Sequence, residues 1–194
     1  IGASCGTFQA RVNADFHEFA FGGEAQDVLD TVSFTAGQGG LSAFPAEPAV
    51  SGATGLPVPG NLGQAWLGAT ATKFLTVTKA TISLDNDLDT RDREFGASTP
   101  QCHGAGMRRV TADIRLYEVD DAATRGLYQA ARAQTPIQVI FQLGQTAGQL
   151  CGAYLKSVVP RVPEFDDEDR LLEWSFGDCR AQGATDDEIY VAFG

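Results

Sequence analysis

The sequence predicts a mainly β fold: an antiparallel β-sandwich or barrel that carries one short α-helix. Three observations predict this class. Several segments alternate apolar and polar residues, one segment has helical periodicity, and a glycine-bounded link joins two alternating segments. At 194 residues, the chain is long enough to bury a substantial core in one domain.

The first strands are expected where apolar and polar residues alternate. In 8–16, apolar residues occupy every second position. This period is typical of an antiparallel strand with one buried face. Segments 74–84 and 110–116 repeat it and are expected to be strands. The apolar faces comprise Phe8, Ala10, Val12, Ala14 and Phe16; Phe74, Ala80, Ile82 and Leu84; and Val110, Ala112, Ile114 and Leu116.

A short helix is expected at 121–133. Asp120 or Asp121 is a suitable N-cap, and small apolar residues recur at helical spacing. Gly126 weakens this helix by roughly 1 kcal/mol relative to alanine. The apolar stripe is narrow, so the helix is expected to lie flat across one edge or opening of the sheet. The stripe consists of Ala123, Leu127, Ala130 and Ala131.

A β-hairpin is expected after the helix. Strands 137–143 and 149–159 flank a five-residue link with glycine at both ends, which is a hairpin signal. Pro160 and Pro163 end the second strand, because proline cannot donate to a strand ladder. The closing strands are expected at 170–178 and 188–193.

Residues 36–71 are expected to form an extended arm or loop within a single domain that spans 1–194. Segment 36–63 is rich in glycine, proline, alanine and serine and has no periodicity. A long irregular segment in a compact domain is usually functional or a linker. Its scattered apolar residues favour an arm that lies on a neighbouring subunit, with a flexible linker as the alternative. These residues are Leu41, Phe44, Val50, Leu56 and Val58.

Two acidic segments are candidates for chemistry. Asp85, Asp87, Asp89 and Asp92 lie in the expected loop 85–96. An EF-hand loop has glycine at position six and glutamate at position twelve, where this chain has threonine and glycine, so calcium binding is disfavoured. Segment 164–170 is expected to be a solvated turn. We expect no catalytic residue, no cofactor and no metal site, because no catalytic or nucleotide-binding motif occurs.

The charge balance and the cysteines limit the possible partners. The net charge is −11, which argues against a protein that grips nucleic acid through phosphates but permits one through which DNA passes. High solubility is an equally adequate explanation of the acidic balance. The cysteines at 5, 102, 151 and 179 fit no zinc spacing, and both two disulfides and four free thiols remain open. No apolar run predicts a membrane span.

The order of segments over 72–194 resembles the tail tube proteins of long-tailed bacteriophages and prophages. An earlier strand and turn at 6–34 are consistent with the same domain. The long glycine- and proline-rich arm departs from the family pattern. The four segments that carry the resemblance are 80–96, 104–121, 137–160 and 170–193.

The resemblance implies a structural virion protein and not an enzyme. Its subunits are expected to form rings whose sheets join edge to edge, and the rings to stack into a tube for DNA ejection. Implied partners are other copies of itself and the tail tip, tape-measure and terminator proteins, with assembly in the host cytoplasm and no specific DNA binding. Some relatives carry a second, N-terminal tube domain. Because the only methionine is Met107, Ile1 is not expected to be a natural start. The chain is expected to be either processed or the ordered part of something longer, and the strand pattern from Gly6 onward favours the second.

Ten residues are expected at contacts between subunits. In the acidic loop, Arg91 and Arg93 are expected to meet carboxylates of an adjacent subunit or ring. In the arm, apolar side chains are expected to lie on a neighbour. The full set is Asp85, Asp87, Asp89, Arg91, Asp92, Arg93, Leu41, Phe44, Leu56 and Val58.

Two other function classes are weighed against the tail tube. A carbohydrate- or receptor-binding β-sandwich would need exposed aromatic side chains that converge on one site. The only tryptophans are Trp66 and Trp174, and Trp174 shares a face with Leu172 and Phe176, which predicts a core position. A hydrolase using the acidic loops would need a carboxylate pair in an apolar pocket, and no pattern predicts one.

Overall fold

The computed structural model describes residues 2–47, 58–96, 99–167, 170–184 and 187–194. It is mainly β, as the sequence predicts. Its elements are β1 (Ser4–Asn13), β2 (Glu18–Glu24), β3 (Gln64–Gly68), β4 (Thr72–Phe74), β5 (Val77–Asp85), β6 (Leu88–Arg91), β7 (Cys102–Ala105), β8 (Arg109–Tyr117), α1 (Ala122–Ala133), β9 (Ile137–Leu143), β10 (Cys151–Val159), β11 (Glu164–Asp166), β12 (Glu173–Ala181) and β13 (Tyr190–Phe193), with two short 3-10 helices at Gln38–Gly40 and Gly60–Leu62.

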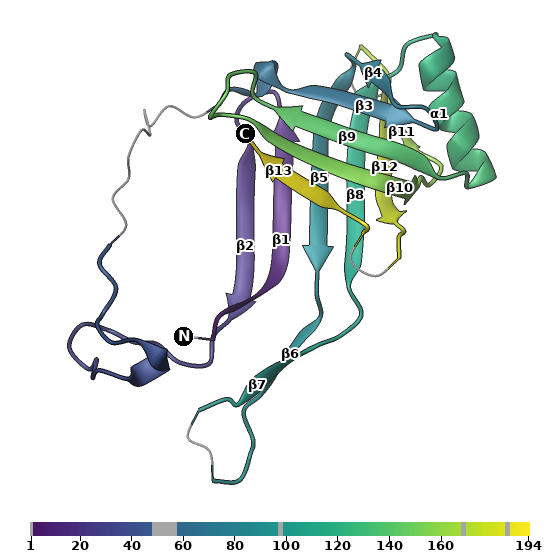
Figure 1. Cartoon of the computed structure of the whole chain (residues 1–194). Coiled ribbons are helices and arrows are strands. Elements are labelled where there is room, and N and C mark those ends of the chain that lie inside the picture. Colours follow the sequence, from purple (N-terminus) through teal and green to yellow (C-terminus); the bar gives the residue numbers. More distant parts are fainter. Residues whose placement is uncertain (1, 48–57, 97–98, 168–169, 185–186) are drawn as a thin grey trace.

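One large antiparallel sheet folds over to make two layers. Its strand order is β2-β1-β5-β8-β12-β10-β9-β3-β4, with β11 paired to β12 and β13 paired to β10. In Figure 1, β2, β1, β5 and β8 run side by side, and β3, β9, β10 and β13 cross in front of them. Strand β12 connects the layers, because it pairs with β8 and with β10.

The core lies where the two layers face each other. Every second residue of β8, from Val110 to Leu116, is buried, and the residues between them are exposed or partly exposed, as expected from the sequence pattern. Opposite it, Leu67 of β3, Phe141 of β9 and Leu155 of β10 are at most 1% exposed. Full burial of such a side chain contributes about 1.5–3 kcal/mol to stability. Trp174 is 7% exposed and also lies in the core, as expected.

Helix α1 begins and ends as the sequence predicts. The Asp121 side chain accepts a 2.7 Å hydrogen bond from the Thr124 N–H, so Asp121 is the N-cap. The helix ends at Gln134, which has a left-handed conformation with φ 50°. Its buried face includes Leu127 and Ala131, and Figure 1 shows the helix at one end of the two layers.

The hairpin of β9 and β10 confirms the turn predicted from glycine. Gly144 and Gly148 both have φ +82°, a left-handed conformation that favours glycine. A Cβ on Gly144 would also lie 2.1 Å from the carbonyl oxygen of Gln149. The turn therefore requires glycine at 144 for two independent reasons.

Several predicted strand boundaries are wrong. The first strand ends at Asn13, and Phe16 lies beyond it, 51% exposed. The expected strand 74–84 is two strands, β4 and β5, in different layers. The expected arm 36–71 includes β3, whose Ala65 and Leu67 are buried against the core. The apolar side chains of this short strand outweigh the irregular composition that precedes it.

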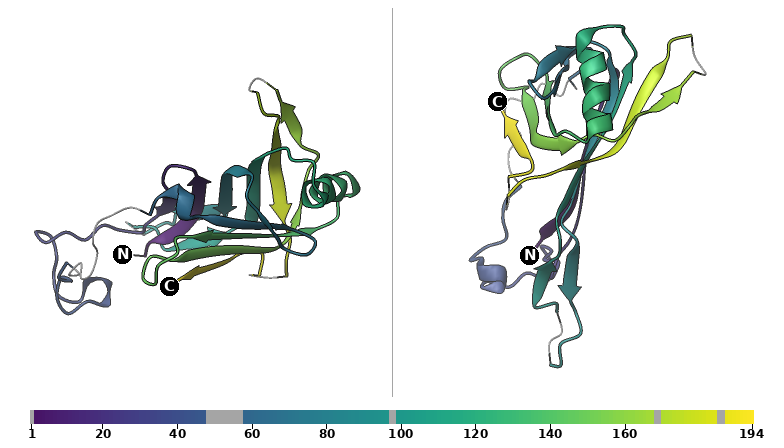
Figure 2. Two further views of the ribbon diagram at one scale, coloured as in Figure 1. Left: turned by 90° about the horizontal axis from the view of Figure 1, so that it is seen from above. Right: turned by 90° about the vertical axis from the view of Figure 1, so that its right-hand side faces the viewer.

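Both acidic segments contain strands that the sequence did not predict. Within 85–96, β6 pairs with β7 to form a separate two-stranded hairpin. Figure 1 shows this hairpin projecting away from the two layers. Within 164–170, β11 pairs with β12, and Figure 2 shows that this pair also projects from the body. Backbone pairing to a partner strand accounts for both, since neither segment has an alternating pattern.

The remaining open alternatives concern cysteines, metals and membranes. All four cysteines are free, and Cys179 is buried. Among the residues that the structure describes, no group of histidine, cysteine and acidic side chains is placed to hold a metal ion. No helix in the described ranges has the length and apolar character needed to cross a membrane.

Candidate assembly surfaces

The base of the β6–β7 hairpin is held by three hydrogen bonds. The Asp85 carboxylate accepts from the Asp87 N–H at 2.9 Å, and Asp87 has φ 48°. The Asn86 side chain donates to the Cys5 carbonyl at 3.0 Å, which ties the hairpin to β1. The Gly106 N–H donates to the Asp87 carbonyl at 2.9 Å and closes the base from the β7 side.

A chain of polar contacts along the hairpin joins it to the N-terminal segment. The His103 ring lies 2.8 Å from the Thr90 hydroxyl through Nδ1 and 2.8 Å from the Gly2 carbonyl through Nε2. The Thr90 hydroxyl also contacts the Glu24 carboxylate at the end of β2. The hairpin therefore has a defined orientation relative to β1 and β2.

The structure gathers the six predicted loop residues on this hairpin. Asp85 ends β5, Asp87 lies in the link to β6, Asp89 and Arg91 belong to β6, and Asp92 and Arg93 follow it. All six are exposed. The Arg93–Asp92 ion pair is long, at 3.8 Å, and its two side chains are 96% and 66% exposed. Such a pair contributes little to folding, so both arginines remain available for other contacts.

The four predicted arm residues lie in a different part of the molecule. Phe44 packs edge-on against Phe34 with ring centroids 5.8 Å apart, and Leu41 is partly buried. Val58 is partly buried, and the next residue, Pro59, forms an isolated antiparallel β-bridge with Phe16. Leu56 lies outside the described residues. Figures 1 and 2 show the segment that holds Leu41 and Phe44 away from the β6–β7 hairpin.

Strand β2 is an edge that the sequence analysis did not single out. It pairs with β1 and ends the strand order, and each of its seven residues is exposed. Phe21 is 71% exposed and lies 5.0 Å from the Phe8 ring, and Phe19 lies 6.3 Å from it. An exposed edge strand with apolar side chains tends to pair with another chain unless something covers it. Residues 18–21 alternate polar or small residues with phenylalanine, but two glycines follow at once, so the sequence is only a weak signal for a strand.

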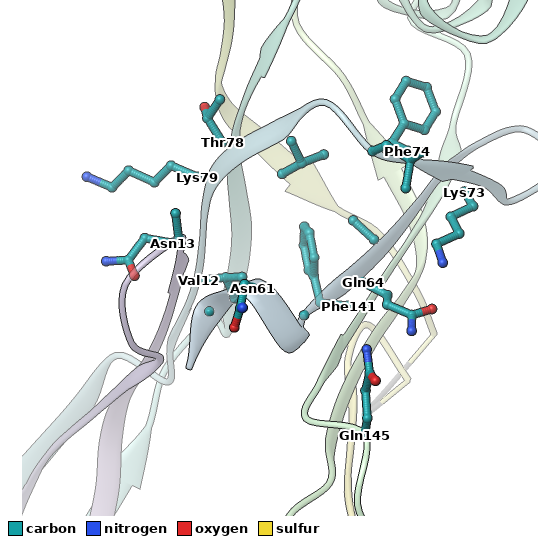
Figure 3. Close-up of a pocket in the computed structure, with 16 residues that line it drawn as sticks. Val12, Asn13, Asn61, Gln64, Lys73, Phe74, Thr78, Lys79, Phe141 and Gln145 are labelled. Carbon is teal, nitrogen blue, oxygen red and sulfur yellow. The ribbon is translucent and has the colours of Figure 1, made fainter. Parts of the chain in front are cut away.

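A cavity of about 390 Å³ opens between the ends of the two layers (Figure 3). Phe141 and Val12 form part of its apolar wall. Lys73 and Lys79 extend on opposite sides of it, and Gln64 and Gln145 add amide groups. Among the described residues, its lining has no carboxylate, histidine or cysteine. It therefore lacks the paired groups that acid–base hydrolysis requires.

Two thiols and one histidine also show no activation. Burial raises the pKa of the Cys151 and Cys179 thiols, which disfavours the nucleophilic thiolate. Burial lowers the pKa of His17, and neither of its ring nitrogens has a hydrogen-bond partner among the described residues. These groups behave as parts of the fold and not as a catalytic set.

Comparison with known proteins gives one clear match. A family model described as phage tail tube protein matches residues 5–185, nearly the whole of this 194-residue chain. A search of curated proteins found no match. The matched family is structural and non-enzymatic. The chain therefore belongs to the phage tail tube protein family.

Proposed function

We propose that this protein, a component of the virion tail, closes into rings that stack into the tail tube through which DNA is ejected. The observation that carries the proposal, beyond family membership, is the free edge strand β2, with all seven residues exposed. Closure of a ring of identical subunits covers such an edge, because each copy's free edge meets the next copy. The sheets then join edge to edge around a central channel.

Contacts between stacked rings are assigned to the β6–β7 hairpin. It projects from the body (Figure 1), and it carries the exposed Arg91 at the end of β6 and the exposed Arg93 in the segment that follows. These arginines meet carboxylates of the adjacent subunit or ring. Exposed ion pairs contribute only about 0–1 kcal/mol each. The hairpin therefore sets register and orientation more than it adds affinity. The other hairpin residues assigned to this contact are Asp85, Asp87, Asp89 and Asp92.

The arm is assigned to a contact with a neighbouring subunit. Phe44 is 39% exposed although it is a large apolar side chain, and Leu41 is only partly buried. A neighbour that covers these side chains and Val58 would remove apolar surface from water. Leu56 belongs to the same set, and its place lies outside the described residues.

The channel is assigned to the polar face of β2, β1, β5 and β8, through which DNA passes without specific binding. Cations and carboxylates balance on this face by strand alternation and register: Arg11, Lys79, Arg109 and Arg115 against Glu18, Glu24, Asp85 and Asp113. A balanced face in a chain of net charge −11 does not trap phosphates.

Assembly takes place in the host cytoplasm, and the tube ends on the tail tip and terminator proteins around a tape-measure protein. The proposal is tested by measuring the mass of the purified protein in solution by light scattering. Closed rings give a mass that is a fixed multiple of the 20.5 kDa subunit. A mass of one subunit at every concentration would contradict the proposal.

A further inference from the structure

We propose that the contact between neighbouring copies joins an acidic edge on one subunit to an arginine patch on the next. This inference rests on the proposed assembly into rings and names the two surfaces that meet. The acidic edge comprises Asp15, Glu18, Glu24, Asp27 and Asp30. The arginine patch comprises Arg109, Arg161 and Arg180.

The acidic edge follows the free strand β2 and the segments on either side of it. Residues 15–30 contain these five carboxylates and neither lysine nor arginine, and all five carboxylates are exposed. Glu18 faces Arg11 across the β1–β2 ladder, at 3.6 Å. Their side chains are 64% and 54% exposed, so solvent screens this pair. The edge therefore keeps a strongly negative character.

The arginine patch is built by strand register. Arg180 of β12 pairs with Thr111 of β8 on one side and with Val159 of β10 on the other. Arg109 lies two residues before Thr111, and Arg161 lies two residues after Val159. Alternate residues of a strand share a face, so register places Arg109 beside Arg180. Arg161 lies there too, because it contacts the carboxylate of Asp178 on β12.

The Asp178 carboxylate lies within the arginine patch. Arg161 Nη2 is 2.7 Å from Asp178 Oδ2, and Arg109 contacts Asp178 Oδ1. Arg180 has no ion pair among the described residues and is exposed. Two of the three guanidinium groups thus share one carboxylate, and the third lies beside them without a carboxylate of its own among the described residues. Asp113 and Arg115 follow on the same face and add one charge of each sign, so the patch stays positive.

The two surfaces occupy opposite ends of one face. The strand order β2-β1-β5-β8-β12 puts β2 at one edge and β12 four strands away. Glu18 and Arg180 lie on the face that points away from the core. In a head-to-tail ring, one end of each subunit meets the other end of the next. The negative edge of each copy therefore meets the positive patch of its neighbour.

At the patch itself, side chains and not backbone pairing specify the contact. The chain beside β12 at the patch runs through Pro160, Arg161, Val162 and Pro163, and the prolines have no N–H to donate to an incoming strand. Charge complementarity across an interface sets orientation and association rate, and like charges oppose wrong pairings. Two arginine patches repel each other, and this repulsion opposes head-to-head pairing of two copies.

The test uses two charge-reversal variants and their combination. Variant A is E18K/E24K and variant B is R161E/R180E. Each is expected to self-associate at least about tenfold more weakly than the parent, because the reversed side chains then face like charges on the neighbouring copy. An equimolar mixture of A and B, and a chain with all four reversals, are expected to associate like the parent. Association is measured by sedimentation velocity at low and physiological salt.

The matched control is R125E/R132E, which reverses two exposed arginines on helix α1, an element that carries no residue of either surface. It changes net charge as much as variant B and is expected to associate like the parent. Circular dichroism melting checks that each variant is folded. A variant that unfolds is replaced by its neutral form, E18Q/E24Q or R161Q/R180Q, with the same expected direction.

The outcomes separate this inference from the proposed function. Rings that form equally well from A and B alone would overturn the charged contact and leave the tube proposal standing. If the parent associates without ever closing rings, and mixing A with B restores that association, the result would support the charged contact and contradict the tube. A parent chain with no self-association would contradict both.

Discussion

Arg161 and Asp178 form an ion pair with Nη2 and Oδ2 2.7 Å apart, and this pair ties the segment after β10 to a bulge in β12. The pairing of β12 with β8 shifts register between Phe176 and Cys179, so Asp178 lies in the bulge, with φ 49°. Its N–H donates to the Asp113 carboxylate at 2.6 Å. The bulge thus depends on one residue that supplies both an unusual backbone conformation and a carboxylate.

Replacement of Asp178 separates these two roles. Asp178→Ala is expected to lower the free energy of unfolding by about 1–3 kcal/mol, because alanine disfavours the left-handed conformation and removes the carboxylate. Asp178→Asn is expected to cost less, since asparagine tolerates that conformation. Urea unfolding measures both values. Equal losses of unfolding free energy in the two variants would contradict this assignment, because alanine and asparagine differ in how well they tolerate the left-handed conformation.

Acidification is expected to destabilise the protein through His17. Burial lowers the pKa of His17 in the folded state, so the unfolded chain binds the proton more readily. The contribution of His17 is therefore fully present above the unfolded pKa of about 6.5 and is lost as the pH falls below it. Melting temperatures between pH 7.5 and 5.5 measure this effect.

The control for that titration is the second histidine. His17→Leu is expected to flatten the pH dependence, because leucine cannot bind a proton. His103→Asn leaves His17 in place and removes the other histidine of the chain, so it shows whether the slope depends on His17 alone. A parent slope that survives in His17→Leu would assign the pH dependence to other groups.

Charge reversal on the β6–β7 hairpin is expected to impair assembly without unfolding the subunit. In R91E/R93E, both changed side chains are exposed, and within the described ranges the one ion pair lost is the long Arg93–Asp92 contact. The melting temperature is therefore expected to stay within about 2 °C of the parent. Ring stacking is expected to fall, as measured by sedimentation. Equal losses of stability and assembly would place the hairpin arginines in the fold and not in a contact between subunits.

Shortening the arm tests its assignment to a neighbour. Deletion of 39–57 spares Gly60, whose N–H donates to the Asp15 carbonyl at 2.6 Å. The shortened chain is expected to keep its far-ultraviolet spectrum and to assemble less well than the parent. Replacing 39–57 with a glycine–serine segment of the same length controls for loop length. Normal assembly of both variants would identify the arm as a linker.

The elements that the sequence predicted have local causes. Helix α1 follows from Asp121 and its apolar stripe, and the β9–β10 turn follows from Gly144 and Gly148. Strand β3 was missed because five residues after a glycine- and proline-rich segment give too short a pattern. Strands β6 and β7 have no alternation, and their place depends on distant groups such as Glu24 and Gly2.

The arginine patch is not predictable from sequence spacing. Arg109, Arg161 and Arg180 come from three separate segments, and the registers of two ladders bring them together. The bulge at Asp178 adds a further shift that no periodic pattern predicts. The acidic edge is visible in the sequence as a stretch without basic residues, but its partner surface appears only in the fold. The six hairpin residues were found together because they are adjacent in the chain.

The central claim, assembly into a tube, is tested most directly by negative-stain electron microscopy of the purified chain over a range of concentrations. Figure 1 shows the free edge β2 and the projecting hairpin on which the claim depends. The predicted result is closed rings with a central channel, and at higher concentration stacks of such rings. Single particles of one-subunit size at every concentration would contradict the claim.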